Sequence, residues 1–161
     1  MSHDTELPDS AVRRRFATEL RVDAAPPVVF PLLCPVRERD WIVGWDAAIR
    51  FSRSGLAEAG CVFQTGHGPD AITWIVHRHE PPRRIGFTLI AADRWIELLD
   101  IEVAPTATGA TLTWTREATA LATDGVAAIA DRFTAYPDRH RRLEAALRHY
   151  LATGQALAEA S

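Results

Sequence analysis

The chain has 161 residues, a net charge of −3, and 47% hydrophobic and 24% charged residues. This composition is typical of one globular domain, and the small acidic charge gives no electrostatic reason to expect a nucleic-acid partner. No apolar run approaches the roughly 20 residues of a membrane span, and the N-terminus lacks the layout of a secretory signal. We therefore expect a cytoplasmic protein that neither binds nucleic acid nor inserts into a membrane.

Missing residue types exclude several kinds of catalysis. All 18 basic residues are arginine, so no lysine can form a Schiff base or bind phosphate in a glycine-rich loop. The serines lie outside any G-x-S-x-G motif, which excludes a nucleophile elbow. Cys34 and Cys61 fit no paired metal or redox spacing, so we expect buried free thiols and no cofactor.

The apolar pattern divides the chain into an arm, one domain and a tail. Residues 1 to 14 are polar and lack a period, which predicts a flexible N-terminal arm. Residues 15 to 154 hold all the periodic apolar segments and predict a single domain. Residues 155 to 161 follow Gly154 as a C-terminal tail.

The domain begins with a strand and two short helices. Phe16, Leu20 and Val22 indicate the strand, and the prolines at 26 and 27 can open a short helix through Leu33. A second short segment is expected over 36 to 42, before Gly44.

Short apolar runs separated by turn residues follow. Their spacing leaves no room for helical crossovers, so consecutive runs must pair as antiparallel hairpins. The expected strands are 47 to 54, 61 to 66, 71 to 80, 84 to 91, 94 to 104 and 110 to 120.

A long helix is expected after Asp124, because apolar or aromatic residues recur there every three or four positions. Pro137 falls inside this pattern and predicts a kink or break, since proline removes a backbone hydrogen bond. The stripe consists of Val126, Ile129, Phe133, Tyr136, His140, Leu143, Leu147 and Tyr150.

Four local patterns accompany this order of elements. They are Ala25-Pro26-Pro27-Val28-Val29-Phe30, the pair Trp41 and Trp45, Glu80-Pro81-Pro82-Arg83-Arg84-Ile85, and Gly109-Ala110-Thr111-Leu112-Thr113-Trp114-Thr115. With these patterns, the chain resembles the START-like (SRPBCC) superfamily over residues 16 to 152. The resemblance implies an α+β helix-grip fold, in which a curved antiparallel seven-stranded sheet surrounds a long C-terminal helix and a mostly apolar cavity. The superfamily includes lipid-transfer domains and polyketide cyclases and has no universal catalytic residue.

A buried ion pair is the sharpest local inference. Alternation in the last two strands turns Glu97 and Arg116 toward the core. If Val103 faces Ala110, Glu97 lies directly opposite Arg116. Pairing explains how both charges are tolerated, either as a structural ion pair or as a pair that orients a ligand.

Histidines offer two further hypotheses. His140 lies on the inward stripe of the long helix, where it either acts as a general acid or base or only completes the stripe at the cavity rim. His77 and His79, with His67, lack a diagnostic metal spacing, and we expect both strand histidines on the solvent side of the sheet and no metal site.

The leading functional hypothesis is a carrier of a small apolar or amphipathic ligand, such as a lipid, an isoprenoid or an aromatic polyketide-like metabolite. One alternative is an enzyme of the polyketide cyclase or dehydratase type, with catalytic candidates Glu97, Arg116 and His140. Another is a protein-interaction module, and a homodimer is also left open. The residues expected to line the cavity are Trp41, Trp45, Phe51, Trp74, Phe87, Trp95, Glu97, Leu99, Trp114, Arg116, Phe133, Tyr136 and His140.

Overall fold

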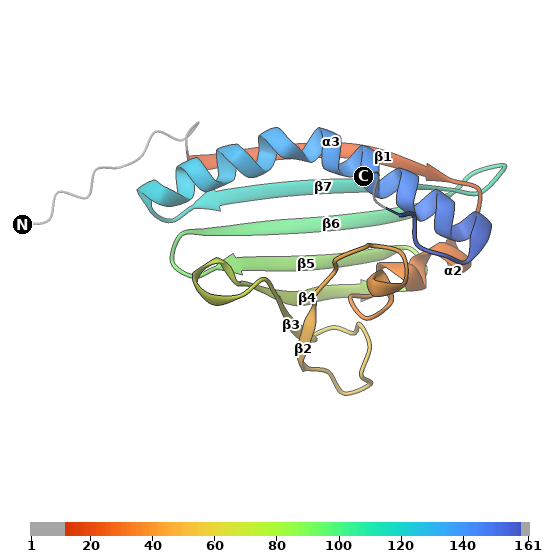
Figure 1. Cartoon of the computed structure of the whole chain (residues 1–161), viewed down its shortest axis with the longest axis horizontal. Coiled ribbons are helices and arrows are strands. Elements are labelled where there is room, and N and C mark those ends of the chain that lie inside the picture. Colours follow the sequence, from red (N-terminus) through yellow and green to blue (C-terminus); the bar gives the residue numbers. More distant parts are fainter. Residues whose placement is uncertain (1–11, 159–161) are drawn as a thin grey trace, which may run out of the picture.

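The computed structural model describes residues 12–158, and within them seven antiparallel strands form one sheet (Figure 1). The strand order is β1-β7-β6-β5-β4-β3-β2, so only the pairing of β1 with β7 joins strands that are far apart in sequence. The helix-grip prediction is confirmed. The strands are β1 (Arg13–Val22), β2 (Ala48–Phe51), β3 (Val62–Thr65), β4 (Ile72–Glu80), β5 (Arg84–Ala91), β6 (Trp95–Pro105) and β7 (Ala110–Ala120).

One face of the sheet is covered by helical segments. The long helix α3 (Thr123–Thr153) runs along β1 and β7, as Figure 1 shows, and also contacts β6. The short segments between β1 and β2 are α2 (Pro26–Val29), η1 (Phe30–Leu33) and η2 (Arg37–Asp40), and a further turn, η3 (Gly68–Asp70), precedes β4. The covered face of the sheet carries the core.

Strict alternation in the central strands produces that core. The odd-numbered residues of β6 from Trp95 to Val103 are buried, as are the even-numbered residues of β7 from Ala110 to Ala120. Both inward sets agree with the sequence prediction. Helical segments cover this face of the sheet, so charged side chains on it are buried and need partners among the residues around them.

The predicted register of the last hairpin is wrong by two residues. Val103 pairs with Leu112, not with Ala110, so Glu97 lies opposite Ala118 and not opposite Arg116. The hairpin turns more tightly than expected, because Pro105 already pairs with Ala110. A shift of two residues leaves the same side chains on the inward face, so the predicted burial pattern is correct although the register is not.

Several element boundaries also differ from the prediction. β1 begins at Arg13, so the last two positions of the expected arm belong to the sheet, while residues 1–11 lie outside the described part. α3 continues through Pro137 without a break and ends at Gly154, which takes the left-handed conformation with φ 72°. The other six strands fall at or within a residue or two of the expected ranges, except that β2 is shorter at its end.

Within residues 12–158, no helix combines the length and apolar character that crossing a bilayer requires.

Candidate functional site

A buried carboxylate on β6 organises the space beneath α3. Glu97 has no solvent exposure, and its Oε1 lies 2.6 Å from Nη1 of Arg116 on β7. The Tyr136 hydroxyl from α3 donates to the same carboxylate at 2.7 Å, and Arg132 adds a guanidinium 3.4 Å away. The predicted ion pair therefore forms, but diagonally across the strands, because the long arginine side chain reaches back toward Glu97.

These contacts saturate Glu97. Its two oxygens accept from Arg116, Arg132 and Tyr136, which leaves little capacity to accept a substrate proton. The nearby aromatic rings also hold the arginines, since Arg132 lies 4.4 Å from the ring centre of Trp95 and Arg116 lies 4.5 Å from that of Tyr136. Glu97 is therefore better suited to orient the arginines than to act as a base.

His140 is held in one neutral tautomer. Its Nδ1 lies 2.9 Å from the carbonyl oxygen of Tyr136, which can only accept, so Nδ1 carries the proton. Its Nε2 then accepts from Nε of Arg116 at 3.4 Å. Burial and the charge of Arg116 lower the pKa of His140 to about 4. With its lone pair occupied, His140 is poorly placed to remove a proton at neutral pH.

A second buried carboxyl, which the sequence prediction missed, faces this cluster from η2. Glu38 is 9% exposed, and within residues 12–158 its carboxyl group has no hydrogen-bond or ion-pair partner. Burial raises the pKa of Glu38 to about 8, although the charges of Arg116 and Arg139 oppose the shift. At neutral pH Glu38 is therefore largely a neutral acid that can donate a hydrogen bond.

Arg139 completes the charged set at its solvent side. The side chain is exposed, yet desolvation and the charges of Arg116 and Arg132 lower the pKa of its guanidinium. Arg139 lies outside the apolar stripe that the sequence indicates for this helix.

Trp114 contributes a buried donor without a partner. Its side chain is 3% exposed, and its Nε1 makes no hydrogen bond within the described chain. Its ring lies 5.3 Å from that of His140 and 5.8 Å from the Arg116 guanidinium carbon. A second buried donor without a partner in the described chain, Arg132 Nε, belongs to the same cluster through the contact of Arg132 with Glu97.

Aromatic rings fill the other half of the covered face. Phe63 stacks on Trp74 with 5.2 Å between ring centres, and Phe87 meets both rings edge-on. Trp45 packs against this group and donates its indole N–H to Pro35 O at 2.8 Å. We call Trp45, Phe63, Trp74 and Phe87 the aromatic cluster, of which Phe63 was not among the expected cavity residues.

The charged and aromatic halves are joined by cross-strand rows. Phe87 pairs with Leu99, and Leu99 pairs with Arg116, so an aromatic ring and a guanidinium lie two strands apart in one row. A neighbouring row runs from Phe63 and Trp74 through Leu89 to Glu97. The covered face therefore changes from aromatic to charged across its width.

The expected cavity residues divide along the same line. Glu97, Trp114, Arg116, Tyr136 and His140 come together in the charged half, where Trp95 and Phe133 join them through Arg132 and Tyr136. Trp41 belongs to neither half: it is fully buried and donates its indole N–H to Leu32 O at 2.8 Å. Phe51 also lies outside both halves. Its ring is 53% exposed on the edge strand β2, where the register with β3 shifts between Ile49 and Phe51, so it lines no enclosed space.

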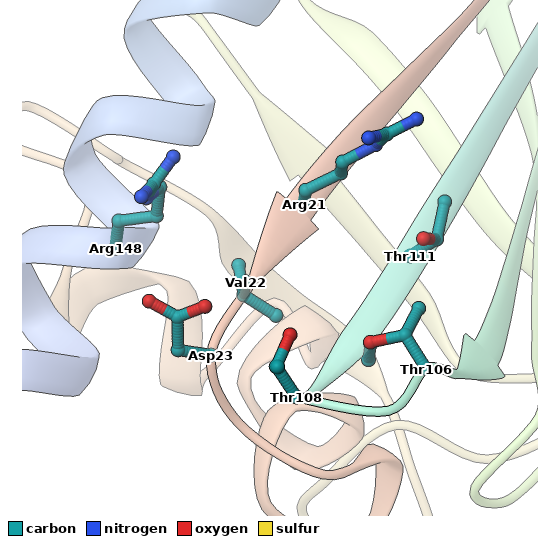
Figure 2. Close-up of a pocket in the computed structure, with 8 residues that line it drawn as sticks. Arg21, Val22, Asp23, Thr106, Thr108, Thr111 and Arg148 are labelled. Carbon is teal, nitrogen blue, oxygen red and sulfur yellow. The ribbon is translucent and has the colours of Figure 1, made fainter.

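The two hollows identified in the described chain lie at the β1 edge. One, of about 500 Å³, lies where the end of β1, the β6–β7 turn and α3 meet, and Figure 2 shows Arg21, Asp23 and Arg148 around it. The other, of about 460 Å³, is lined by Phe16, Phe133 and the arginines at 13 to 15. The first hollow is lined by no residue of the charged half, whereas the second shares Phe133 with it, and the Phe16 ring there lies 5.1 Å from that of His140.

The histidines of β4 do not lie on one side of the sheet. His77 faces outward and bonds to Thr88 on β5 at 3.0 Å, as expected. His79 was expected beside it, but a bulge between Val76 and Arg78 turns it inward, where its ring lies 5.7 Å from Phe30. Among the described residues, no group of three or more potential ligands is arranged to hold a metal ion.

Solved structures share this fold at low sequence identity. No family model matches the chain, and no curated protein matches it. An uncharacterized protein from Rhizobium leguminosarum aligns with a TM-score of 0.61 at 16% identity, covering 85% of this chain and 95% of its own. CalU16 from Micromonospora echinospora aligns at 0.52 and 17%, covering 89% and 73%. DynU16, from the dynemicin biosynthetic locus, aligns at 0.54 and 18%, covering 92% of this chain and 49% of its own.

Proposed function

We propose that the protein is a member of the START-like superfamily that binds and carries a small amphipathic molecule. The apolar part of this ligand packs against the aromatic cluster, and its polar part is bound by Glu38, Arg116 and Arg139. The observation that carries the proposal is the presence of two buried donors without protein partners in the described chain, Trp114 Nε1 and Arg132 Nε, in the cluster around Glu97. Buried polar groups that lack partners are costly unless a ligand or water satisfies them.

The shape of the ligand follows from the cross-strand rows. A molecule that spans the distance from Phe87 to Arg116 crosses two strand spacings, or roughly 10 Å, which suits a fused aromatic or short acyl compound. Neither of the two hollows described above is lined by Phe87 or Arg116, so binding along this row requires side chains to move. The structural neighbour from the dynemicin locus supports a secondary metabolite as one ligand of this kind.

The test is native mass spectrometry of freshly purified protein, followed by denaturing extraction and a panel of lipids and aromatic polyketides. We expect a stoichiometric ligand, and Arg139→Ala should weaken its retention about tenfold while leaving the fold unchanged. Arg141→Ala is the matched control, because Arg141 lies two residues further along α3 and, among residues 12–158, pairs only with Asp138, at 3.0 Å. A bare protein that retains nothing from the panel would overturn the proposal and favour a protein-interaction role.

One observation favours an enzyme of the cyclase or dehydratase type as the second candidate. Glu38 is protonated at neutral pH and lies near Arg116, an arrangement that can supply a general acid beside an oxyanion-stabilising group. The catalytic residue would then be Glu38 and not Glu97 or His140, whose acceptor atoms are occupied. Turnover of the extracted ligand that falls at least about a hundredfold in Glu38→Gln would identify this activity.

A further inference from the structure

Around Glu97 the hydrogen-bond acceptors are occupied and two donors are left over. Both carboxylate oxygens of Glu97 accept bonds from neighbouring side chains, and Nε2 of His140 accepts from Arg116. Trp114 Nε1 and Arg132 Nε are buried donors that have no partner in the described chain. A ligand that satisfies such donors must offer acceptor atoms, as a carbonyl or a carboxylate group does.

The hollow of about 460 Å³ at the β1 edge reaches the same cluster. Phe16, which is half-buried, and Phe133 both line this hollow. The Phe16 ring lies 5.1 Å from the ring of His140, which in turn lies 5.3 Å from the ring of Trp114. Phe16 is also the cross-strand neighbour of Arg116. The Phe16 ring therefore contacts both the hollow and the charged half.

The cross-strand row of the proposed ligand ends at this ring. Phe87 pairs with Leu99, Leu99 with Arg116, and Arg116 with Phe16. A molecule that moves along the row from the hollow, with its apolar end first, brings that end to Phe87 and leaves its polar end beside Arg116. This orientation agrees with the change from aromatic to charged residues across the covered face.

We propose that this site selects ligands whose polar end is a carbonyl or carboxylate group, and that these ligands enter through the hollow between Phe16 and Phe133. The inference rests on the proposed function, which it narrows from amphipathic molecules in general to those that offer a hydrogen-bond acceptor. Trp114 Nε1 donates to the acceptor group beside Arg116, whose guanidinium carbon lies 5.8 Å from the Trp114 ring. Phe16 moves aside when the ligand enters.

Three naphthalenes of similar size test the selection. 2-Acetylnaphthalene offers a neutral carbonyl group, 2-naphthoate offers a carboxylate, and 2-ethylnaphthalene has no polar group. In equilibrium dialysis at pH 7, we expect at least one of the two acceptor compounds to bind at least about tenfold more tightly than 2-ethylnaphthalene. Tighter binding of 2-naphthoate than of the ketone would assign an acid to the site, and the reverse order a neutral carbonyl compound.

Trp114→Phe tests the donor, because this variant keeps an aromatic ring and removes the N–H. The preference for the acceptor compound over 2-ethylnaphthalene should fall below about threefold. Trp74→Phe is the control, since the indole N–H of Trp74 already donates to Thr65 at 2.9 Å. This control should keep the preference, even if both compounds bind more weakly.

Two exposed threonines allow the entrance to be tested separately. Thr134 lines the hollow beside Phe16, whereas Thr108 lines the other hollow. A large ring at the entrance obstructs the ligand, so Thr134→Trp should slow association of the tighter-binding compound at least about tenfold in stopped-flow measurements. Thr108→Trp should leave the association rate unchanged.

Each failure has its own signature. If none of the three compounds binds, the proposed small-molecule site is wrong, and the narrower inference falls with it. If 2-ethylnaphthalene binds as tightly as the other two, the site exists but does not select acceptors. A preference that persists in Trp114→Phe would exclude Trp114 as the donor. Equal association rates in Thr134→Trp and Thr108→Trp would exclude the proposed entrance.

Discussion

The two halves of the covered face differ in how far their buried N–H groups are hydrogen-bonded. In the aromatic cluster every described indole N–H is satisfied: Trp74 donates to Thr65 at 2.9 Å and Trp45 to Pro35 O at 2.8 Å. In the charged half, Trp114 Nε1 and Arg132 Nε make no hydrogen bond within the described chain. The first half is complete without a ligand, whereas the second half retains unused polar capacity.

This difference implies that the two halves respond differently to solution conditions. Packing of aromatic rings depends on buried area and shape, which do not change with pH. The charged half holds two groups with strongly displaced pKa values, Glu38 at about 8 and His140 at about 4. Changes of pH should therefore act on the structure mainly through the charged half.

Removal of the central carboxylate should have the largest effect. Glu97→Ala leaves the buried Arg116 and the half-buried Arg132 without their anion, so we expect the free energy of unfolding to fall by about 3 to 5 kcal/mol. Urea denaturation at pH 7 measures this loss. Glu117→Ala is the control: it removes a solvent-exposed partner of Arg13 and Arg15 and should cost at most about 1 kcal/mol. Equal losses in the two variants would contradict the central place of Glu97.

Glu38 should destabilise the protein at alkaline pH. Its pKa in the folded state is about 8, above its ordinary value of 4.5, so stability is fully present below pH 4.5 and is lost as the pH rises through 8. The shift in the pKa of Glu38 limits the loss in the free energy of unfolding to about 4 kcal/mol between pH 5 and 8.5. Hydration of the ionised carboxylate lowers the expected loss to about 3 kcal/mol. Thermal denaturation of Glu38→Gln across this range should lack the alkaline loss; a wild-type profile in the variant would exclude Glu38 as its source.

His140 should have the opposite effect and destabilise the protein at acid pH. Its pKa is lowered from 6.5 to about 4 in the folded state, so the unfolded chain takes up the proton first and stability falls as the pH drops through 6.5 toward 4. We expect a loss of about 2 kcal/mol between pH 7 and pH 5. His140→Gln, which can still donate to Tyr136 O and accept from Arg116, should reduce this loss in urea titrations. If the variant still loses stability as the pH falls, other groups cause that loss.

Sequence reasoning predicted much of the charged half because its signals are local. Alternation alone turned Glu97 and Arg116 inward, and the helical period placed Tyr136 and His140 on the buried stripe. A register error of two residues did no harm to these assignments, since side chains two apart share a face. The strand order also followed, because short connections require neighbouring hairpins.

Other parts of the site were missed for identifiable physical reasons. Glu38 lies in the charged run Arg37-Glu38-Arg39-Asp40, which reads as a solvated surface, although its spacing from Cys34 and Trp41 is that of one helical face. The bulge that turns His79 inward inserts one residue into β4. A strict alternation of inward and outward residues does not predict such an insertion. Both errors concern irregular backbone, where the position of a side chain depends on tertiary packing.

A substitution in the aromatic half gives the smallest expected effect and completes the comparison. Phe87→Leu removes a ring that meets Phe63 and Trp74 edge-on, but leaves an apolar side chain in the row, so we expect a loss of about 1 to 1.5 kcal/mol. Because no titratable group contributes to these contacts, the loss should be the same at pH 5, 7 and 8.5 in urea denaturation. Phe51→Leu, at a ring that is 53% exposed, is the matched control and should change stability by less than about 0.5 kcal/mol. A loss in Phe87→Leu that varies with pH would mean that the two halves are coupled through Leu99, and that the aromatic cluster also senses the charge of the site.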